Sequence, residues 1–187
     1  MPDRPAETAR PVPSAPQLAA PSYILMDFNS GRILVEHNAD ERVEPASITK
    51  LMTAYVVFHE LGEGTLSLQD MVPVSEKAWR TGGSRMFIDP KMTVSVEDLI
   101  RGMVIQSGND ASVALAEHVA GSEESFAELM NHFAQQLGMT STNFRNATGL
   151  PDPDHYTTAR DVATLSLATI RDFPEFYTWY AEKEFTF

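Results

Sequence analysis

The sequence predicts an α+β fold, in which a short β-hairpin comes first and a run of helices follows. Two observations lead to this prediction. Short apolar runs bounded by turn residues occur early in the chain, whereas apolar residues at helical spacing dominate afterwards. Strands and helices do not alternate along the chain, so a parallel βαβ sheet is not expected. With 187 residues, the chain has the length of one ordinary domain or of one domain with a small satellite.

Composition limits the functions that the chain could have. The 14 Lys and Arg residues against 26 Asp and Glu residues give a net charge of −12. Such an acidic chain is repelled by phosphate backbones and by anionic membranes, which argues against nucleic acid as a main partner. There is no cysteine, so disulfides, thiolate metal sites and cysteine nucleophiles are excluded. The sequence predicts neither a membrane-spanning segment nor a signal peptide.

Residues 1–21 differ in composition from the rest of the chain. Six of the twelve prolines lie there, and no periodic apolar pattern accompanies them. Proline-rich segments of this kind are extended rather than folded. We therefore expect a tail or linker over residues 1–21 and a folded domain over residues 22–187.

Two early segments are expected to pair as the hairpin. Residues 23–28 and 32–36 have the composition of strands, and the Asn-Ser-Gly sequence between them is typical of a turn. Two further short strands are expected at residues 72–74 and 86–88, in a stretch that is otherwise rich in loop residues.

The first expected helix differs from the others in its apolar character. Residues 48–58 are apolar almost all round, which predicts a helix buried on every side and ended by Gly62 and Gly64. Later segments show a single apolar face or many small residues, with capping pairs at Ser95 and Asp98 and at Thr158 and Asp161. These later helices are expected at residues 96–104, 111–119, 126–137 and 158–170, with a loop at residues 143–155.

Ser47 and Lys50 are the strongest candidates for chemistry. They lie three residues apart at the start of the apolar helix, so their side chains share one face. A serine hydroxyl needs a base to take its proton, and a lysine becomes a base when burial lowers its pKa. The pair is therefore predicted to be a nucleophile with its general base. The alternative is a helix-capping serine beside a lysine that reaches solvent.

Ser107 and Asn109 are the second pair of candidates. They flank Gly108 on a tight turn between two expected helices, so both side chains could face one cleft. The hydroxyl could relay a proton and the amide could hold a substrate amide. The alternative is a glycine that ends one helix and an asparagine that caps the next. The same Ser-x-Asn pattern at residues 141–143 shows that this pattern is not specific by itself.

The remaining polar residues predict no further site. Asp152 and Asp154 resemble the start of a calcium loop, but Thr157 stands where the loop requires glycine. The histidines lack metal-ligand spacing and are expected at the surface or as helix caps. They are His37, His59, His118, His132 and His155.

Ser47-Ile48-Thr49-Lys50 together with Ser107-Gly108-Asn109 resembles two of the three signature elements of serine β-lactamases and penicillin-binding proteins. Longer blocks of sequence are similar, in the same order, to low-molecular-mass penicillin-binding proteins. These are the D-alanyl-D-alanine carboxypeptidases of the penicillin-binding protein 5 and 6 type, in peptidase family S11. The resemblance covers about residues 22–187, with blocks at residues 42–54, 82–87, 105–122, 138–151 and 155–161.

The resemblance implies a β-lactamase/transpeptidase-like fold and a serine-type D-Ala-D-Ala carboxypeptidase. Ser47 would attack the terminal D-Ala-D-Ala bond of a peptidoglycan stem peptide, and β-lactams would acylate the same serine. Lys50 would be the general base, Ser107 would pass the proton to the leaving amine, and Asn109 would hold the substrate backbone. No metal or cofactor is implied. The implied location is bacterial and periplasmic or extracytoplasmic, with inner-membrane association of the full-length proteins.

The third signature element, Lys-Thr-Gly, does not occur in this sequence. The lysines after Lys50 are Lys77, Lys91 and Lys183, and none precedes Thr-Gly. The resemblance implies further strands, a β-rich second domain and a membrane anchor, so we expect the chain to be truncated at its C-terminus and to lack the anchor. A two-stranded hairpin is marginal alone. We therefore expect a partner chain or a swapped dimer to supply strands.

Two alternatives to an active carboxypeptidase remain open. A non-catalytic piece that binds peptidoglycan or β-lactams would keep the helices and lack the carboxylate-binding strand. A class A-like β-lactamase would need a glutamate in the loop after Ser-x-Asn to activate water, and residues 143–151 contain none.

Overall fold

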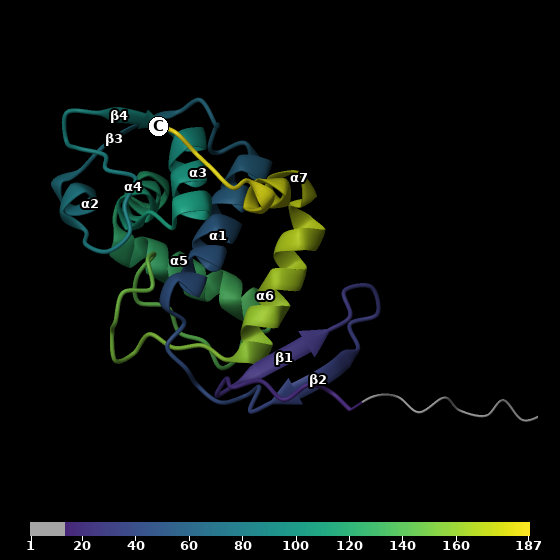
Figure 1. The fold of residues 1–187 in the computed structure, drawn as a ribbon. Coiled ribbons are helices and arrows are strands. Elements are labelled where there is room, and N and C mark those ends of the chain that lie inside the picture. Colours follow the sequence, from purple (N-terminus) through teal and green to yellow (C-terminus); the bar gives the residue numbers. More distant parts are fainter. Residues whose placement is uncertain (1–13) are drawn as a thin grey trace, which may run out of the picture.

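Helix α1 (Thr49–Glu63) lies in the middle of the fold, with the other helices around it and a β-hairpin at one end (Figure 1). The structure is a computed structural model that describes residues 14–187. Its α+β class is the one that the sequence predicts. In chain order the elements are β1 (Tyr23–Met26), β2 (Ile33–His37), η1 (Ala46–Ile48), α1, β3 (Met71–Pro73), α2 (Glu76–Arg80), β4 (Thr93–Ser95), α3 (Val96–Gln106), α4 (Asn109–Ala120), α5 (Glu123–Gln136), α6 (Ala159–Asp172), α7 (Pro174–Tyr177) and η2 (Thr178–Ala181).

Burial of α1 on every side confirms the expectation from its apolar sequence. The helix contacts α3, α4, α5 and α6, and a continuous run of its residues from Met52 to Phe58 is buried. It ends at Gly64, whose φ of 73° is left-handed. Gly62 lies inside the helix, so the prediction that it ends the helix is wrong. The last turn of α1 is partly exposed, where the absence of a side chain at Gly62 is tolerated.

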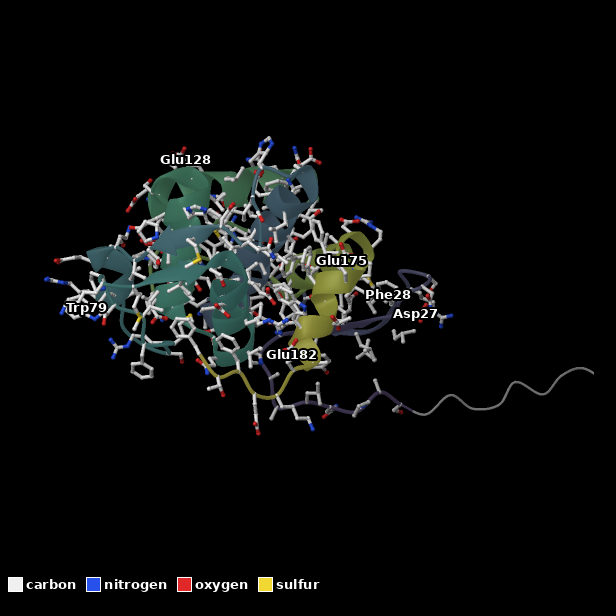
Figure 2. The ribbon with its side chains drawn as sticks, turned by 90° about the horizontal axis from the view of Figure 1, so that it is seen from above. Asp27, Phe28, Trp79, Glu128, Glu175 and Glu182 are labelled. Carbon is white, nitrogen blue, oxygen red and sulfur yellow. The ribbon has the colours of Figure 1, made fainter. Side chains whose placement is uncertain are left out.

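The hairpin forms where the sequence predicts it. Strands β1 and β2 pair antiparallel, with Leu25 opposite Val35, and the Asp27 carboxylate accepts the backbone N–H of Ser30 in the turn. The strands form a two-stranded sheet that packs against α6. Figure 2 shows the turn of this hairpin, with Asp27 and Phe28, at the opposite end of the molecule from Trp79.

A second small sheet joins β3 to β4, with Val72 opposite Val94. The expected strand at residues 72–74 is thereby confirmed within one residue. The partner strand at residues 93–95 was not expected from the sequence, because three residues are too few to show a period.

The strand expected at residues 86–88 does not form. The backbone N–H groups of Met86, Phe87 and Ile88 instead donate to the carboxylate of Asp110, over 3.0, 2.9 and 3.3 Å. Asp110 is fully buried in the first turn of α4. One carboxylate thus accepts the hydrogen bonds that a neighbouring strand would otherwise accept, and Phe87 adopts a positive φ of 66°.

The capping residues in the sequence correctly predict where two of the later helices begin. The Ser95 hydroxyl accepts the N–H of Asp98 at the start of α3, and the Thr158 hydroxyl accepts the N–H of Asp161 at the start of α6. The helices expected at residues 111–119 and 126–137 correspond to α4 and α5. Helices α2, α7 and η2 were not expected, because they are too short for a repeating apolar pattern.

The N-terminal part of the chain is described only in part. Residues 14–22 contain no helix or strand, and the rest of the expected tail, residues 1–13, lies outside the described residues. Among residues 14–187, no helix is both long enough and apolar enough to cross a membrane.

We expect Asp110→Ala to lower the free energy of unfolding by about 3 kcal/mol or more, because it leaves several buried N–H groups without an acceptor. Urea unfolding followed by circular dichroism measures the change. Glu76→Ala is the control, since it removes only an exposed ion pair with Arg80 and should cost below about 0.5 kcal/mol. Equal unfolding midpoints for the two variants would contradict the structural role of Asp110.

Candidate active site

A cavity of about 260 Å³ opens beside the amino end of α1. It brings together three of the four residues that the sequence singles out, although they come from two distant parts of the chain. Helix α3, the turn after it and η2 complete the walls. The lining residues are Ser47, Ile48, Lys50, Leu51, Met103, Val104, Ser107 and Tyr180.

Ser47 lies in η1, the short 3-10 turn that leads into α1, and it is exposed. Its side chain caps neither helix, so the alternative of a capping serine is wrong. The turn depends on a close approach by Gly149. A Cβ atom on Gly149, whose φ is 85°, would lie 1.8 Å from the carbonyl oxygen of Ala46. Only glycine allows the loop to pack this closely against the turn that carries Ser47.

Lys50 is buried, with 6% of its surface exposed. Its Nζ donates to the Ser47 Oγ over 3.4 Å and to the carbonyl oxygen of Thr148 over 2.9 Å. The alternative of a lysine that reaches solvent is therefore wrong. Burial lowers the pKa of Lys50 to about 8, because the charged form loses its hydration.

Thr148 makes a contact with Lys50 that the sequence does not indicate. Its backbone carbonyl, rather than its side chain, is the partner of Lys50. Any residue type supplies such a carbonyl, so no sequence signal could have identified it.

Ser107 lines the same cavity from the C-terminal end of α3. Its φ of 57° places it in the left-handed region, which is uncommon for a residue other than glycine. The alternative in which Gly108 ends this helix is wrong, since Ser107 is the residue that ends α3 and Gly108 has an extended conformation at the start of α4. Ser107 thus carries the backbone strain at the point where it faces the cavity.

Asn109 differs from the other three, because it does not line the cavity. It is the first residue of α4, and its Nδ2 donates to the carbonyl of Gly82 over 2.7 Å. Its backbone N–H donates to the carbonyl of Ser84, also over 2.7 Å. Asn109 therefore holds the loop at residues 82–84 with its amide nitrogen. Gly108, and not Asn109, is the capping position of α4.

His155 contradicts the expectation of a surface or capping histidine. It is buried, and its Nδ1 accepts the backbone N–H of Arg145, so Nε2 carries the proton and donates to the Thr49 hydroxyl over 2.8 Å. Burial lowers the pKa of His155 and favours this neutral form. The contact ties the loop at residues 143–155 to the first turn of α1. Within residues 14–187, no group of three or more acidic or histidine side chains is arranged to hold a metal ion.

Comparison with known proteins supports the resemblance. Residues 9–187 match the family described as D-alanyl-D-alanine carboxypeptidase. The carboxypeptidase DacC of Escherichia coli is 51% identical over 92% of this chain, and DacA of Haemophilus influenzae is 50% identical over 92%. Penicillin binding protein 5 from Haemophilus influenzae has a TM-score of 0.91 and 49% identity, and the match covers 94% of this chain and 52% of that one.

These matches extend over only part of each relative. The chain spans 45% of DacC and 44% of DacA, so it is about half the length of the curated relatives that it matches. The solved carboxypeptidase DacD from Francisella tularensis gives a TM-score of 0.89 over 91% of this chain and 41% of that one. The structural likeness confirms the expected β-lactamase/transpeptidase-like fold, of which the chain forms a part. This chain belongs to the D-alanyl-D-alanine carboxypeptidase family, peptidase family S11.

Proposed function

We propose that residues 22–187 are the N-terminal part of the catalytic domain of a serine-type D-Ala-D-Ala carboxypeptidase, preceded by a proline-rich segment at residues 1–21. The observation that carries the proposal is the contact between Lys50 and Ser47. A buried amine, whose pKa is lowered to about 8, lies 3.4 Å from an exposed hydroxyl. This arrangement activates a serine without a histidine or a metal ion.

In the proposed reaction, neutral Lys50 takes the proton of Ser47 as Oγ attacks the carbonyl carbon of the terminal peptide bond. Backbone N–H groups near Ser47 stabilise the oxyanion. The C–N bond then breaks, and the released D-alanine amine receives the proton through Ser107. Water hydrolyses the ester on Ser47, with Lys50 again as the base, and frees the shortened stem peptide.

Asn109 is proposed to hold the substrate backbone. Its Nδ2 is committed to Gly82, so Oδ1 is the atom of its side chain that can accept a substrate N–H.

The relatives support a peptidoglycan substrate and β-lactam binding. Their names describe D-alanyl-D-alanine carboxypeptidases and penicillin-binding proteins, and they come from bacteria. We therefore propose a stem peptide ending in D-Ala-D-Ala as substrate, β-lactams as covalent inhibitors, and a periplasmic or extracytoplasmic location with inner-membrane association of the full-length protein.

We also propose that strands from a partner chain or a second copy cover the hairpin. A cavity of about 530 Å³ lies between β1, η1 and α6, and apolar side chains dominate its lining. Leu25 and Ile48 line it and are more than half exposed. A two-stranded sheet with an open apolar flank gains stability when more strands pair with it.

Incubation with benzylpenicillin tests the nucleophile. We expect intact mass spectrometry to show one acyl adduct on the parent chain and none on Ser47→Ala, because the alanine has no oxygen to acylate. Circular dichroism confirms that both proteins are folded. A well-folded parent without an adduct would show that this chain binds at most and does not catalyse.

The rate of acylation by benzylpenicillin is expected to rise with pH and to level off above a midpoint near pH 8. The sign follows from the role of Lys50 as a base. Its neutral form is the minor one below its pKa of about 8 and the major one above it. Lys50→Arg, which stays charged across this range, should reduce the rate by about 100-fold or more. A midpoint near the ordinary lysine pKa would argue against the buried base.

Thermal melting at increasing protein concentration tests whether a second copy or a partner chain covers the hairpin. If a second copy supplies the contact, the melting temperature should rise with concentration, and Leu25→Asp should abolish the rise. Met71→Asp, an equally exposed position on the other sheet, is the control and should leave it intact. If a different chain supplies the strands, the isolated protein should melt without cooperativity. A cooperative, concentration-independent transition of a monomer would speak against both forms of the proposal.

A further inference from the structure

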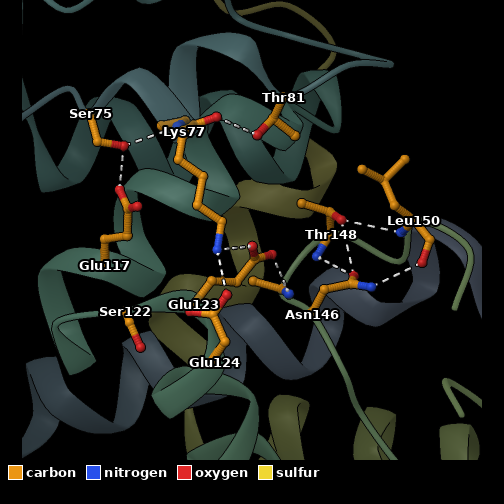
Figure 3. A network of polar contacts seen from close by, with 12 residues as sticks. Ser75, Lys77, Thr81, Glu117, Ser122, Glu123, Glu124, Asn146, Thr148 and Leu150 are labelled. Carbon is orange, nitrogen blue, oxygen red and sulfur yellow. Dashed lines mark hydrogen bonds and ion pairs between the residues drawn. The ribbon is translucent and has the colours of Figure 1, made fainter.

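Glu123 lies outside the cavity, but it contacts the loop at residues 146–150 (Figure 3). The Thr148 carbonyl in this loop accepts the Lys50 amine. It stands in the first turn of α5, and only 12% of its side chain is exposed. Its Oε1 accepts the backbone N–H of Ala147 over 3.1 Å, and its Oε2 pairs with Lys77 Nζ over 3.0 Å. The carboxylate therefore bridges α2 and the loop at residues 146–150.

Ala147 is held from two sides. It is fully buried, so its N–H needs an acceptor within the protein, and Glu123 supplies one. Its carbonyl accepts the hydroxyl of Thr53 over 2.7 Å, and Thr53 lies on α1 one turn after Lys50. The contacts to α5 and α1 fix the position of Ala147 between the two helices.

The next residue makes the contact to the proposed base. The carbonyl of Thr148 accepts Lys50 Nζ over 2.9 Å. Asn146 stiffens this part of the loop, because its Oδ1 accepts the backbone N–H groups of Thr148 and Gly149 and its Nδ2 donates to the carbonyl of Leu150. A displacement of Ala147 would therefore move the Thr148 carbonyl with it.

Glu124 provides a natural comparison with Glu123. Both carboxylates pair with the same Lys77, over 2.8 and 3.0 Å. The Glu124 side chain is 76% exposed, whereas that of Glu123 is mostly buried and contacts the loop. An exposed ion pair contributes little to stability, but a buried carboxylate that accepts a backbone N–H is costly to remove.

We propose that Glu123 is a positioning residue for Lys50. Its carboxylate, held by Lys77, fixes Ala147 and thereby keeps the Thr148 carbonyl against the Lys50 amine, away from water. The catalytic consequence of this arrangement rests on the proposed function, whereas the positioning itself does not.

The test compares Glu123→Ala with Glu124→Ala in two measurements that need no substrate. The first is hydrogen exchange of the peptide that contains residues 146–150. The second is the pH dependence of Lys50 acetylation under competitive labelling, read by mass spectrometry. We expect Glu123→Ala to speed exchange by about tenfold and to move the Lys50 midpoint upward by about one pH unit, because water enters beside the amine. Glu124→Ala should leave both at the values of the parent.

Parental values for both measurements in a folded Glu123→Ala variant would overturn the proposal, and so would equal changes in Glu124→Ala. A loss of stability alone does not move the Lys50 midpoint in the folded state, so this measurement separates positioning from general destabilisation. If Glu123→Ala does not fold, Glu123→Gln replaces it. The neutral amide should then give smaller changes of the same sign, and unchanged values would again overturn the proposal. The benzylpenicillin adduct on the parent chain tests the proposed function separately.

Discussion

Burial of the Lys50 amine at the start of an apolar helix is the constraint on which the surrounding structure depends. Burial of a charged ammonium costs free energy because the group loses its hydration. The neutral amine is therefore favoured, and the pKa of Lys50 falls to about 8. The amine still needs partners, and the Thr148 carbonyl and the Ser47 hydroxyl are within reach. The carbonyl can stand there only because Gly149 allows the loop to approach the backbone of Ala46. The geometry of the site thus depends on the packing of one loop.

Polar side chains hold several irregular segments of the fold. Asp110 accepts three N–H groups of residues 86–88, and Asn131 bonds both the N–H and the carbonyl of Phe144. His155 connects Arg145 to Thr49. Strands would satisfy such backbone groups with other backbone groups, but loops need side chains for this purpose. Asp110, Asn131 and His155 thus hold the backbone, and none of the three lines the cavity.

The sequence correctly predicts those parts of the fold that depend on contacts between residues close together in the chain. Ser95 and Thr158 cap helices through contacts three residues away, and the apolar run of α1 shows its burial directly. The sequence wrongly predicts a strand at residues 86–88, because their partner, Asp110, lies more than 20 residues later in the chain. The motifs identify Ser47, Lys50 and Ser107, which line one cavity, and Asn109, which holds a loop through a contact that its motif does not indicate.

Burial and a neighbouring charge are two different causes of a shifted pKa, and the pKa of Lys50 depends on burial. Leu51, Met103 and Val104 line the cavity beside Lys50, and burial is the cause of its lowered pKa. A pKa set by a neighbouring charge changes when that charge is removed. A pKa set by burial changes when water enters, whichever residue lets the water in. Residues that hold the loop in place can therefore shift the pKa of Lys50 without contacting it.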